Sequence, residues 1–129
     1  MVETRETLIT FKGLPQPAKN FRTDGRGYVR LPSDGSLVMS VILEWGVVAY
    51  KSVDGGYAWN YLSTILLGTD VPHSEEGPNE NDLALMADGS IICIIRLDGG
   101  DGRCASDSQA ILVSMQISVG DYAPANHWN

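Results

Sequence analysis

The sequence predicts an all-β protein, and three observations support this fold class. Two Asp-Gly-Ser turns each lie between apolar segments, the apolar runs are rich in Val, Ile, Tyr and Trp, and no stretch shows the 3.6-residue period of an amphipathic helix. With 129 residues, 43% of them hydrophobic, the chain is long enough to bury one core. We therefore expect a single unit, residues 1–129, built from antiparallel strands.

An internal repeat organises the chain. Residues 29–38 align with residues 83–92 at a constant offset of 54, which places Asp34–Ser36 on Asp88–Ser90. Asp tolerates a left-handed conformation, and Gly adopts positive φ without steric cost, so Asp-Gly between apolar segments favours a tight turn. Each copy is therefore predicted to be a β-hairpin.

Eight strands are predicted. The first is a short run at residues 7–11, and a polar, proline-containing connection at residues 68–81 separates two larger groups of strands. The first group, within residues 27–67, has strands near residues 28–32, 37–43, 46–52 and 59–66. The second group, within residues 82–129, has strands near residues 82–86, 90–97 and 110–117, and its fourth strand is missing.

Composition and charge disfavour several classes of partner. The chain has 16 acidic residues against 9 Lys and Arg and no basic run, so nucleic acid is not expected as a partner. Its longest apolar run, near residues 37–43, is much shorter than the ~20 residues that span a bilayer. The first 13 residues lack the basic start and apolar core of a signal peptide. We expect a soluble protein without a membrane partner, and its compartment stays open.

The two cysteines allow one disulfide at most. Cys93 lies in an apolar run, which is typical of a buried free thiol, whereas a disulfide with Cys104 stays possible. Besides these, only His73 and His127 offer nitrogen ligands, and the spacing fits no zinc site. No metal or cofactor is expected.

Residues 52–59, Ser-Val-Asp-Gly-Gly-Tyr-Ala-Trp, form a tight turn between two predicted strands. Asp54 can accept hydrogen bonds from turn amides, Gly56 can supply positive φ, and Trp59 can cover the sheet below the turn. The segment resembles the Asp box, Ser/Thr-x-Asp-x-Gly-x-Thr-Trp, of sialidases and other proteins with bacterial neuraminidase repeats, and departs from it at Ala58. In that family the box joins the third and fourth strands of a propeller blade, away from the active site. The resemblance therefore implies a structural role for Ser52, Asp54, Gly56 and Trp59.

The resemblance also implies an architecture: two four-stranded antiparallel blades of a sialidase-type, six-bladed β-propeller. Residues 27–67 are then the first blade and residues 82–129 the second, incomplete one, with a weaker echo of the box at residues 118–128. Two blades cannot close a ring, so we expect closure by oligomerisation or by missing chain. A homotrimer is favoured, with residues 1–12 completing a blade of a neighbouring chain. The alternative is a fragment of a longer propeller.

A second resemblance concerns residues 79–96. Sialidases open the blade after an Asp-box blade with Asn-Glu-Pro and return along an apolar strand to an Arg, as Asn79-Glu80-Asn81 and Arg96 do here. The resemblance implies that Glu80 is a candidate catalytic residue that assists a tyrosine nucleophile. It implies that Arg96 is a candidate substrate-binding residue, which suits a planar guanidinium facing a carboxylate. From the residues alone, Glu80 also fits a solvated surface acid, and Arg96 a strand-end arginine paired with Asp98 or Asp101.

The machinery for sialidase catalysis is incomplete in the sequence. The turn at Glu44–Trp45 is too short for the family's acid/base segment, Phe21–Arg22 lacks the proline of the family's first arginine motif, and Arg30 lies too close to its turn. We therefore predict a non-catalytic glycan-binding or scaffold module that recognises an acidic, carboxylate-bearing sugar. The first alternative is a sialidase-like glycoside hydrolase active only as a homo-oligomer, in which Glu80 polarises Tyr57 or Tyr61. The second is a relic of a longer propeller without a ligand.

Overall fold

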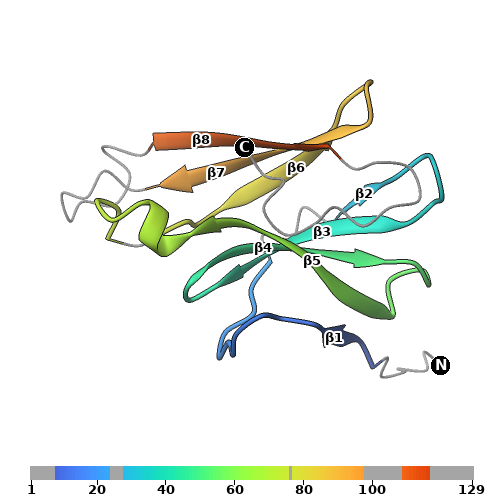
Figure 1. Ribbon diagram of the computed structural model, residues 1–129, viewed down its shortest axis with the longest axis horizontal. Coiled ribbons are helices and arrows are strands. Elements are labelled where there is room, and N and C mark those ends of the chain that lie inside the picture. The colour runs from blue at the N-terminus through green and yellow to red at the C-terminus, as the bar shows by residue number, and fades with distance from the viewer. Residues whose placement is uncertain (1–7, 24–27, 76, 98–108, 117–129) are drawn as a thin grey trace, which may run out of the picture.

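The structure is a computed structural model that describes residues 8–23, 28–75 and 77–97 in full, together with the backbone of residues 109–116. Within these residues the chain is all-β, which confirms the predicted fold class. One 3-10 turn, η1 (Gly68–Asp70), interrupts the strands, and no helix of the described residues is long and apolar enough to cross a membrane. The strands form two sheets that lie as two layers (Figure 1).

The first sheet has five strands in the order β1-β5-β4-β3-β2, and the second has three in the order β6-β7-β8. Their bounds are β1 (Thr10–Lys12), β2 (Val29–Arg30), β3 (Leu37–Leu43), β4 (Gly46–Ser52), β5 (Ala58–Leu67), β6 (Asn81–Leu85), β7 (Ser90–Leu97) and β8 (Gln109–Gln116). From β2 onward, each strand begins and ends within two residues of its predicted limits. Strands β2 to β5 form an antiparallel meander, as do β6 to β8.

The two Asp-Gly-Ser hairpins differ in loop length, which corrects the constant offset of 54 expected from the sequence. Backbone hydrogen bonds join Leu31 to Ser36 in the first hairpin and Met86 to Ser90 in the second, leaving loops of four and three residues. The second strands of the two hairpins, β3 and β7, keep the offset of 54. The first strands do not: Val29 pairs with Val38, and Ala84 pairs with Ile92, so β2 and β6 correspond at an offset of 55. The missing loop residue moves the pairing of the first strand by one position.

The N-terminal strand pairs within its own chain. β1 runs parallel to β5, with Thr10 opposite Ala58 and Lys12 opposite Asn60, and it forms one edge of the first sheet (Figure 1). From the sequence, we expect this segment to complete a blade of a neighbouring chain, whereas in the structure it pairs with β5. Exchange with a neighbouring chain stays a prediction.

One apolar core lies between the two sheets. It forms because both β3 and β7 alternate their side chains between two faces, and one face of each strand points to the other sheet. Its buried members are Leu31, Val38, Ile42, Val47, Ala49, Leu62, Ile65, Val71, Ile91, Cys93, Ile95 and Leu97. Cys93 is a free thiol, and burial raises its pKa to about 12, which leaves it protonated at neutral pH. Cys104 lies outside the described residues.

A second apolar cluster covers the opposite face of the first sheet. Its buried members are Leu37, Val41, Leu43, Val48, Tyr50 and Trp59. Residues 13–22, here called the strap, follow β1 and pack Leu14 and Ala18 against this cluster. The rings of Phe11 and Phe21 also lie 5.1 and 6.3 Å from the ring of Tyr50. The first sheet is therefore covered on both faces, by the second sheet and by the strap.

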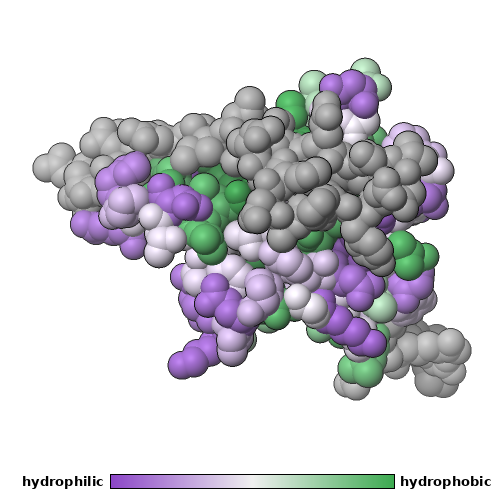
Figure 2. Space-filling model, viewed as in Figure 1, coloured by the Kyte–Doolittle hydropathy of each residue, from purple (hydrophilic) through white to green (hydrophobic). Residues whose placement is uncertain are grey.

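The surface drawn in Figure 2 is mostly hydrophilic over the described residues, and apolar residues reach it in small groups. This agrees with a net charge of −7.

Candidate functional site

All four residues expected to hold the Ser52–Trp59 turn take part in its hydrogen bonds. Ser52 Oγ donates to Asp54 Oδ1 over 2.8 Å and accepts from the amide of Gly56 over 2.9 Å. Asp54 also accepts from the amide of Ala58, and Trp59 Nε1 donates to the carbonyl of Gly56 over 2.8 Å. Gly56 has a φ of 103°, which explains the need for glycine there.

These contacts hold the Asp54 carboxylate in its ionised form. The amide of Ala58 and the hydroxyl of Ser52 are the main causes that lower the pKa of Asp54 below its ordinary value. The side chains of Ser52, Asp54 and Trp59 bond to groups within the turn, so they serve local structure.

The structure brings Glu80 and Arg96 together. Arg96 Nη1 lies 3.0 Å from Glu80 Oε2, and the Arg96 amide donates to the Glu80 carbonyl over 2.8 Å. The alternative partners expected for Arg96, Asp98 and Asp101, lie outside the described residues. The carboxylate expected to assist a tyrosine is thus engaged by the arginine expected to bind substrate.

The two candidate tyrosines lie elsewhere. The Tyr61 hydroxyl shares a hydrogen bond of 2.7 Å with Thr64 Oγ1, and its ring packs on the strap side of the first sheet. Tyr57 is exposed in the turn before β5. Glu80 directly precedes β6 of the second sheet, which packs on the opposite face of the first. The structure therefore does not bring Glu80 to either tyrosine.

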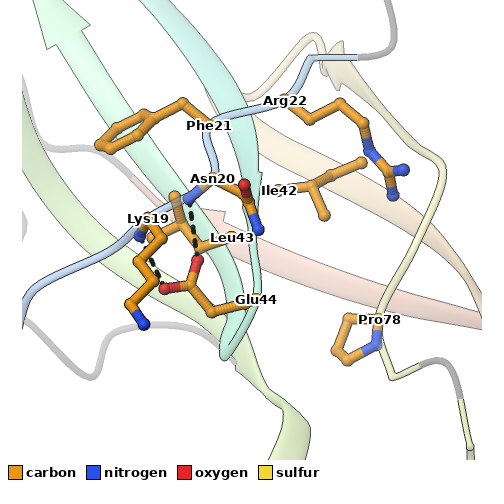
Figure 3. Close-up of a pocket in the computed structure, with 8 residues that line it drawn as sticks. All are labelled: Lys19, Asn20, Phe21, Arg22, Ile42, Leu43, Glu44 and Pro78. Carbon is orange, nitrogen blue, oxygen red and sulfur yellow. Dashed lines mark hydrogen bonds between the residues drawn. The ribbon is translucent and has the colours of Figure 1, made fainter.

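A cleft of about 600 Å³ reaches Pro78, two residues before Glu80. Its walls come from the strap, from the end of β3 with the turn that follows it, and from the segment before β6 (Figure 3). The lining residues are Lys19, Asn20, Phe21, Arg22, Ile42, Leu43, Glu44 and Pro78.

Glu44 anchors one end of the cleft. Its carboxylate accepts from the amides of Lys19 over 2.7 Å and of Asn20 over 3.2 Å (Figure 3). These donors, led by the Lys19 amide, lower the pKa of Glu44 below its ordinary value. Among the described residues that line the cleft, the acid is Glu44, which is ionised and holds the strap through these two bonds.

Arg22 forms the other end of the cleft. Its backbone exchanges hydrogen bonds of 3.0 and 2.7 Å with Ile42. Its guanidinium extends towards Pro78 in Figure 3 and donates from Nη2 to Asn79 Oδ1 over 2.8 Å. Because Asn79 precedes Glu80, the guanidinium groups of Arg22 and Arg96 contact neighbouring residues of one segment.

In the sequence Phe21–Arg22 is an incomplete arginine motif and Glu44 is part of a short turn, and no local pattern places Arg22 beside Asn79. The available clue was a Lys and an Arg three residues apart in the segment Lys19–Arg22 of an acidic chain. Their meeting with residue 79 depends on the packing of the strap.

Among the residues that the structure describes, no three His, Cys, Asp or Glu side chains gather closely enough to hold a metal ion. No protein-family model, curated protein or solved structure matches this chain.

Proposed function

We propose that the chain is a non-catalytic carbohydrate-binding module whose cleft takes the carboxylate of an acidic sugar. The observation that carries this proposal is the position of Arg22, whose guanidinium stands in the cleft wall and is oriented by Asn79. A guanidinium held in this way retains donors for a ligand, because it has five N–H groups in a planar fork. Carboxylates are its natural partners since two parallel charge-assisted bonds can form.

The rest of the cleft suits a small polar ligand with an anionic group. Lys19 and Arg22 are both exposed, and the Glu44 carboxylate is hydrogen-bonded to two backbone amides. Asn20 adds an amide that can both donate to and accept from sugar hydroxyls. A volume of about 600 Å³ also lies within the usual range for small-molecule sites.

We propose further that the two sheets are successive blades of a sialidase-type β-propeller. Support comes from the antiparallel order β2-β3-β4-β5 and from the position of the Ser52–Trp59 turn between the third and fourth of these strands. Three such chains would supply the six blades of a ring.

A binding role is favoured over catalysis by the separation of the candidate groups. A sialidase-like mechanism needs a glutamate beside its tyrosine nucleophile. Here Glu80 pairs with Arg96, while Tyr61 bonds to Thr64 on the other side of the first sheet. The alternatives, a hydrolase active only as a homo-oligomer and a ligand-free relic, have no comparable observation in their favour.

The test is calorimetric titration with a sialic-acid-terminated trisaccharide and with its neutral counterpart lacking that sugar. We expect binding of the acidic trisaccharide alone, and a loss of affinity of about tenfold or more in Arg22→Gln, because a charge-assisted pair is removed. Arg30→Gln is the matched control, since Arg30 is an exposed arginine that bonds to the carbonyl of Gly35, outside the cleft.

Three results would contradict the proposal. Equal affinity for both trisaccharides would remove the carboxylate from recognition, and unchanged binding in Arg22→Gln would remove the cleft. Hydrolysis of a fluorogenic sialoside that is abolished in Arg96→Ala would replace binding with catalysis.

A further inference from the structure

The two hairpins, β2–β3 and β6–β7, present opposite faces to the core they share. Val38, Ser40 and Ile42 of β3 face the second sheet, as the core membership of Val38 and Ile42 and the hydrogen bond between Ser40 and Asn81 show. The corresponding positions of β7 are Ile92, Ile94 and Arg96, and they point the other way, because Ile91, Cys93, Ile95 and Leu97 are the ones that enter the core. The two hairpins are therefore stacked in the same orientation, so that one face of the first packs against the opposite face of the second.

A front-to-back contact is heterologous, so the same contact can be repeated. The first hairpin, β2–β3, contacts the second sheet through one of its faces. The corresponding face of the second hairpin, β6–β7, points away from the core. With the loop difference taken into account, Leu31, Val29, Val38, Ser40 and Ile42 correspond to Met86, Ala84, Ile92, Ile94 and Arg96.

This outer face carries exposed apolar residues, with Asp82 and Arg96 on the same face. Met86 is 43% and Ile94 52% exposed, whereas Leu31 and Val38 of the first hairpin are 4% and 0% exposed. Ala84 is also exposed, and Ile92 is half-buried. Exposed apolar side chains gathered on one face of a sheet are typical of an interaction surface.

We propose that the outer face of the second sheet binds a second copy of this chain, through the strap side of that copy's first sheet. The occupant follows from the repeat. Inside one chain, the inner face of the first hairpin packs on the core face of β7, which consists of Ile91, Cys93, Ile95 and Leu97. The positions of β3 that correspond to this face are Leu37, Met39, Val41 and Leu43. Three of these are buried members of the cluster that the strap covers, and Met39 packs against that cluster.

The strap must therefore move for two chains to join, and its contacts fit a removable cover. It is held by the bonds of Glu44 to the amides of Lys19 and Asn20, and by Trp45 Nε1, which donates to the carbonyl of Pro17 over 3.1 Å. Phe11 and Phe21 stay 39% and 46% exposed.

The cover also leaves a buried polar atom unsatisfied. Tyr50 is 0% exposed, and its hydroxyl has no hydrogen-bond partner among the described residues. Phe11 and Phe21 offer only rings to it. Since an unsatisfied buried hydroxyl is unfavourable, the closed strap is weaker than its apolar contacts alone would make it.

The proposal concerns assembly, and it is tested without a sugar ligand because the strap that must move carries Lys19 and Arg22 of the cleft. Its test is sedimentation velocity of the full chain from roughly 1 µM to roughly 300 µM. We expect concentration-dependent association, and at least about a tenfold weakening in the double variant Met86→Lys/Ile94→Lys, because two charges would enter an apolar contact. Val53→Lys is the matched control, since Val53 is 74% exposed on the turn before β5.

A variant that loosens the strap gives the second arm. Glu44→Ala removes both bonds to the strap amides, so we expect it to strengthen association of the full chain. Far-ultraviolet circular dichroism checks that each variant keeps the β fold. A monomer at every concentration in both the wild type and Glu44→Ala would overturn the proposal. So would an association that Met86→Lys/Ile94→Lys leaves unchanged or that Val53→Lys weakens equally.

Discussion

The two sheets are built from similar hairpins but are buried differently. The first sheet has apolar residues on both faces of β3 and β4, and both faces are covered, one by the second sheet and one by the strap. The second sheet buries Ile91, Cys93 and Ile95 on one face of β7 and leaves Ile94 exposed on the other. An apolar strand face thus becomes core only where another element reaches it.

The sharpest test of this difference compares two neighbouring residues of β7. Ile95→Ala should lower the free energy of unfolding by about 2–5 kcal/mol, because it opens a cavity in the core between the sheets. Ile94→Ala should change it by less than about 1 kcal/mol, because Ile94 lies on the exposed face. Urea denaturation at low protein concentration measures both. Equal losses at the two positions would mean that the outer face of β7 is covered as well as the inner one.

An intermediate effect is expected from acid, which acts on the turns of both sheets. The Ala58 amide and Ser52 lower the pKa of Asp54, Ser36 lowers that of Asp34, and Ser90 lowers that of Asp88. A carboxyl whose pKa is lower in the folded chain stabilises the fold above its unfolded pKa, and this contribution is lost as pH falls through the folded value. Stability should therefore decrease as pH falls below the ordinary value of 3.8.

The measurement is denaturation of the wild type and of Asp54→Asn between about pH 5 and about pH 2. The variant should be less stable at neutral pH, because a charged acceptor of the turn is lost, and its stability should depend less steeply on pH. A variant with the same pH dependence as the wild type would show that Asp54 is not held in its ionised form.

The smallest effect is expected at the turn of the first hairpin, where Lys51 Nζ lies 3.6 Å from Asp34 Oδ2. The Asp34 side chain is 40% exposed, so solvent screens this pair. Lys51→Met should change the free energy of unfolding by less than about 1 kcal/mol, measured by the same denaturation. A larger loss would show that the ion pair, rather than the shared core, distinguishes the first hairpin from the second.

Local sequence was sufficient for the strands and turns. The Asp-Gly-Ser segments and the Ser52–Trp59 segment each carry side chains that bond to amides at most four residues away, so their conformation needs no distant partner. The strand limits followed for the same reason, since alternation and turn residues are local properties. One error, the constant offset of 54, came from a loop shortened by one residue, which changes strand pairing without changing the pattern around Asp-Gly-Ser.

The candidate site was only partly predictable. Arg96 and Glu80 were selected from the sequence, but their mutual ion pair depends on the pairing of β6 with β7. Arg22 lies 57 residues from Asn79, and Glu44 lies 25 residues from Lys19, so no local pattern could place them around one cleft.

By itself, the sequence determined an all-β chain, the two hairpins, the self-contained turn before β5 and the apolar character of both faces of β3 and β7. Only the tertiary structure decided which of those faces is buried, that β1 pairs with β5, and that the strap brings Lys19 and Arg22 to a cleft beside Pro78 and Asn79. The physical reason is the sequence separation of the residues that interact. Turn geometry and side-chain alternation arise from neighbouring residues, whereas burial and the convergence of charges depend on segments that meet only when the sheets pack.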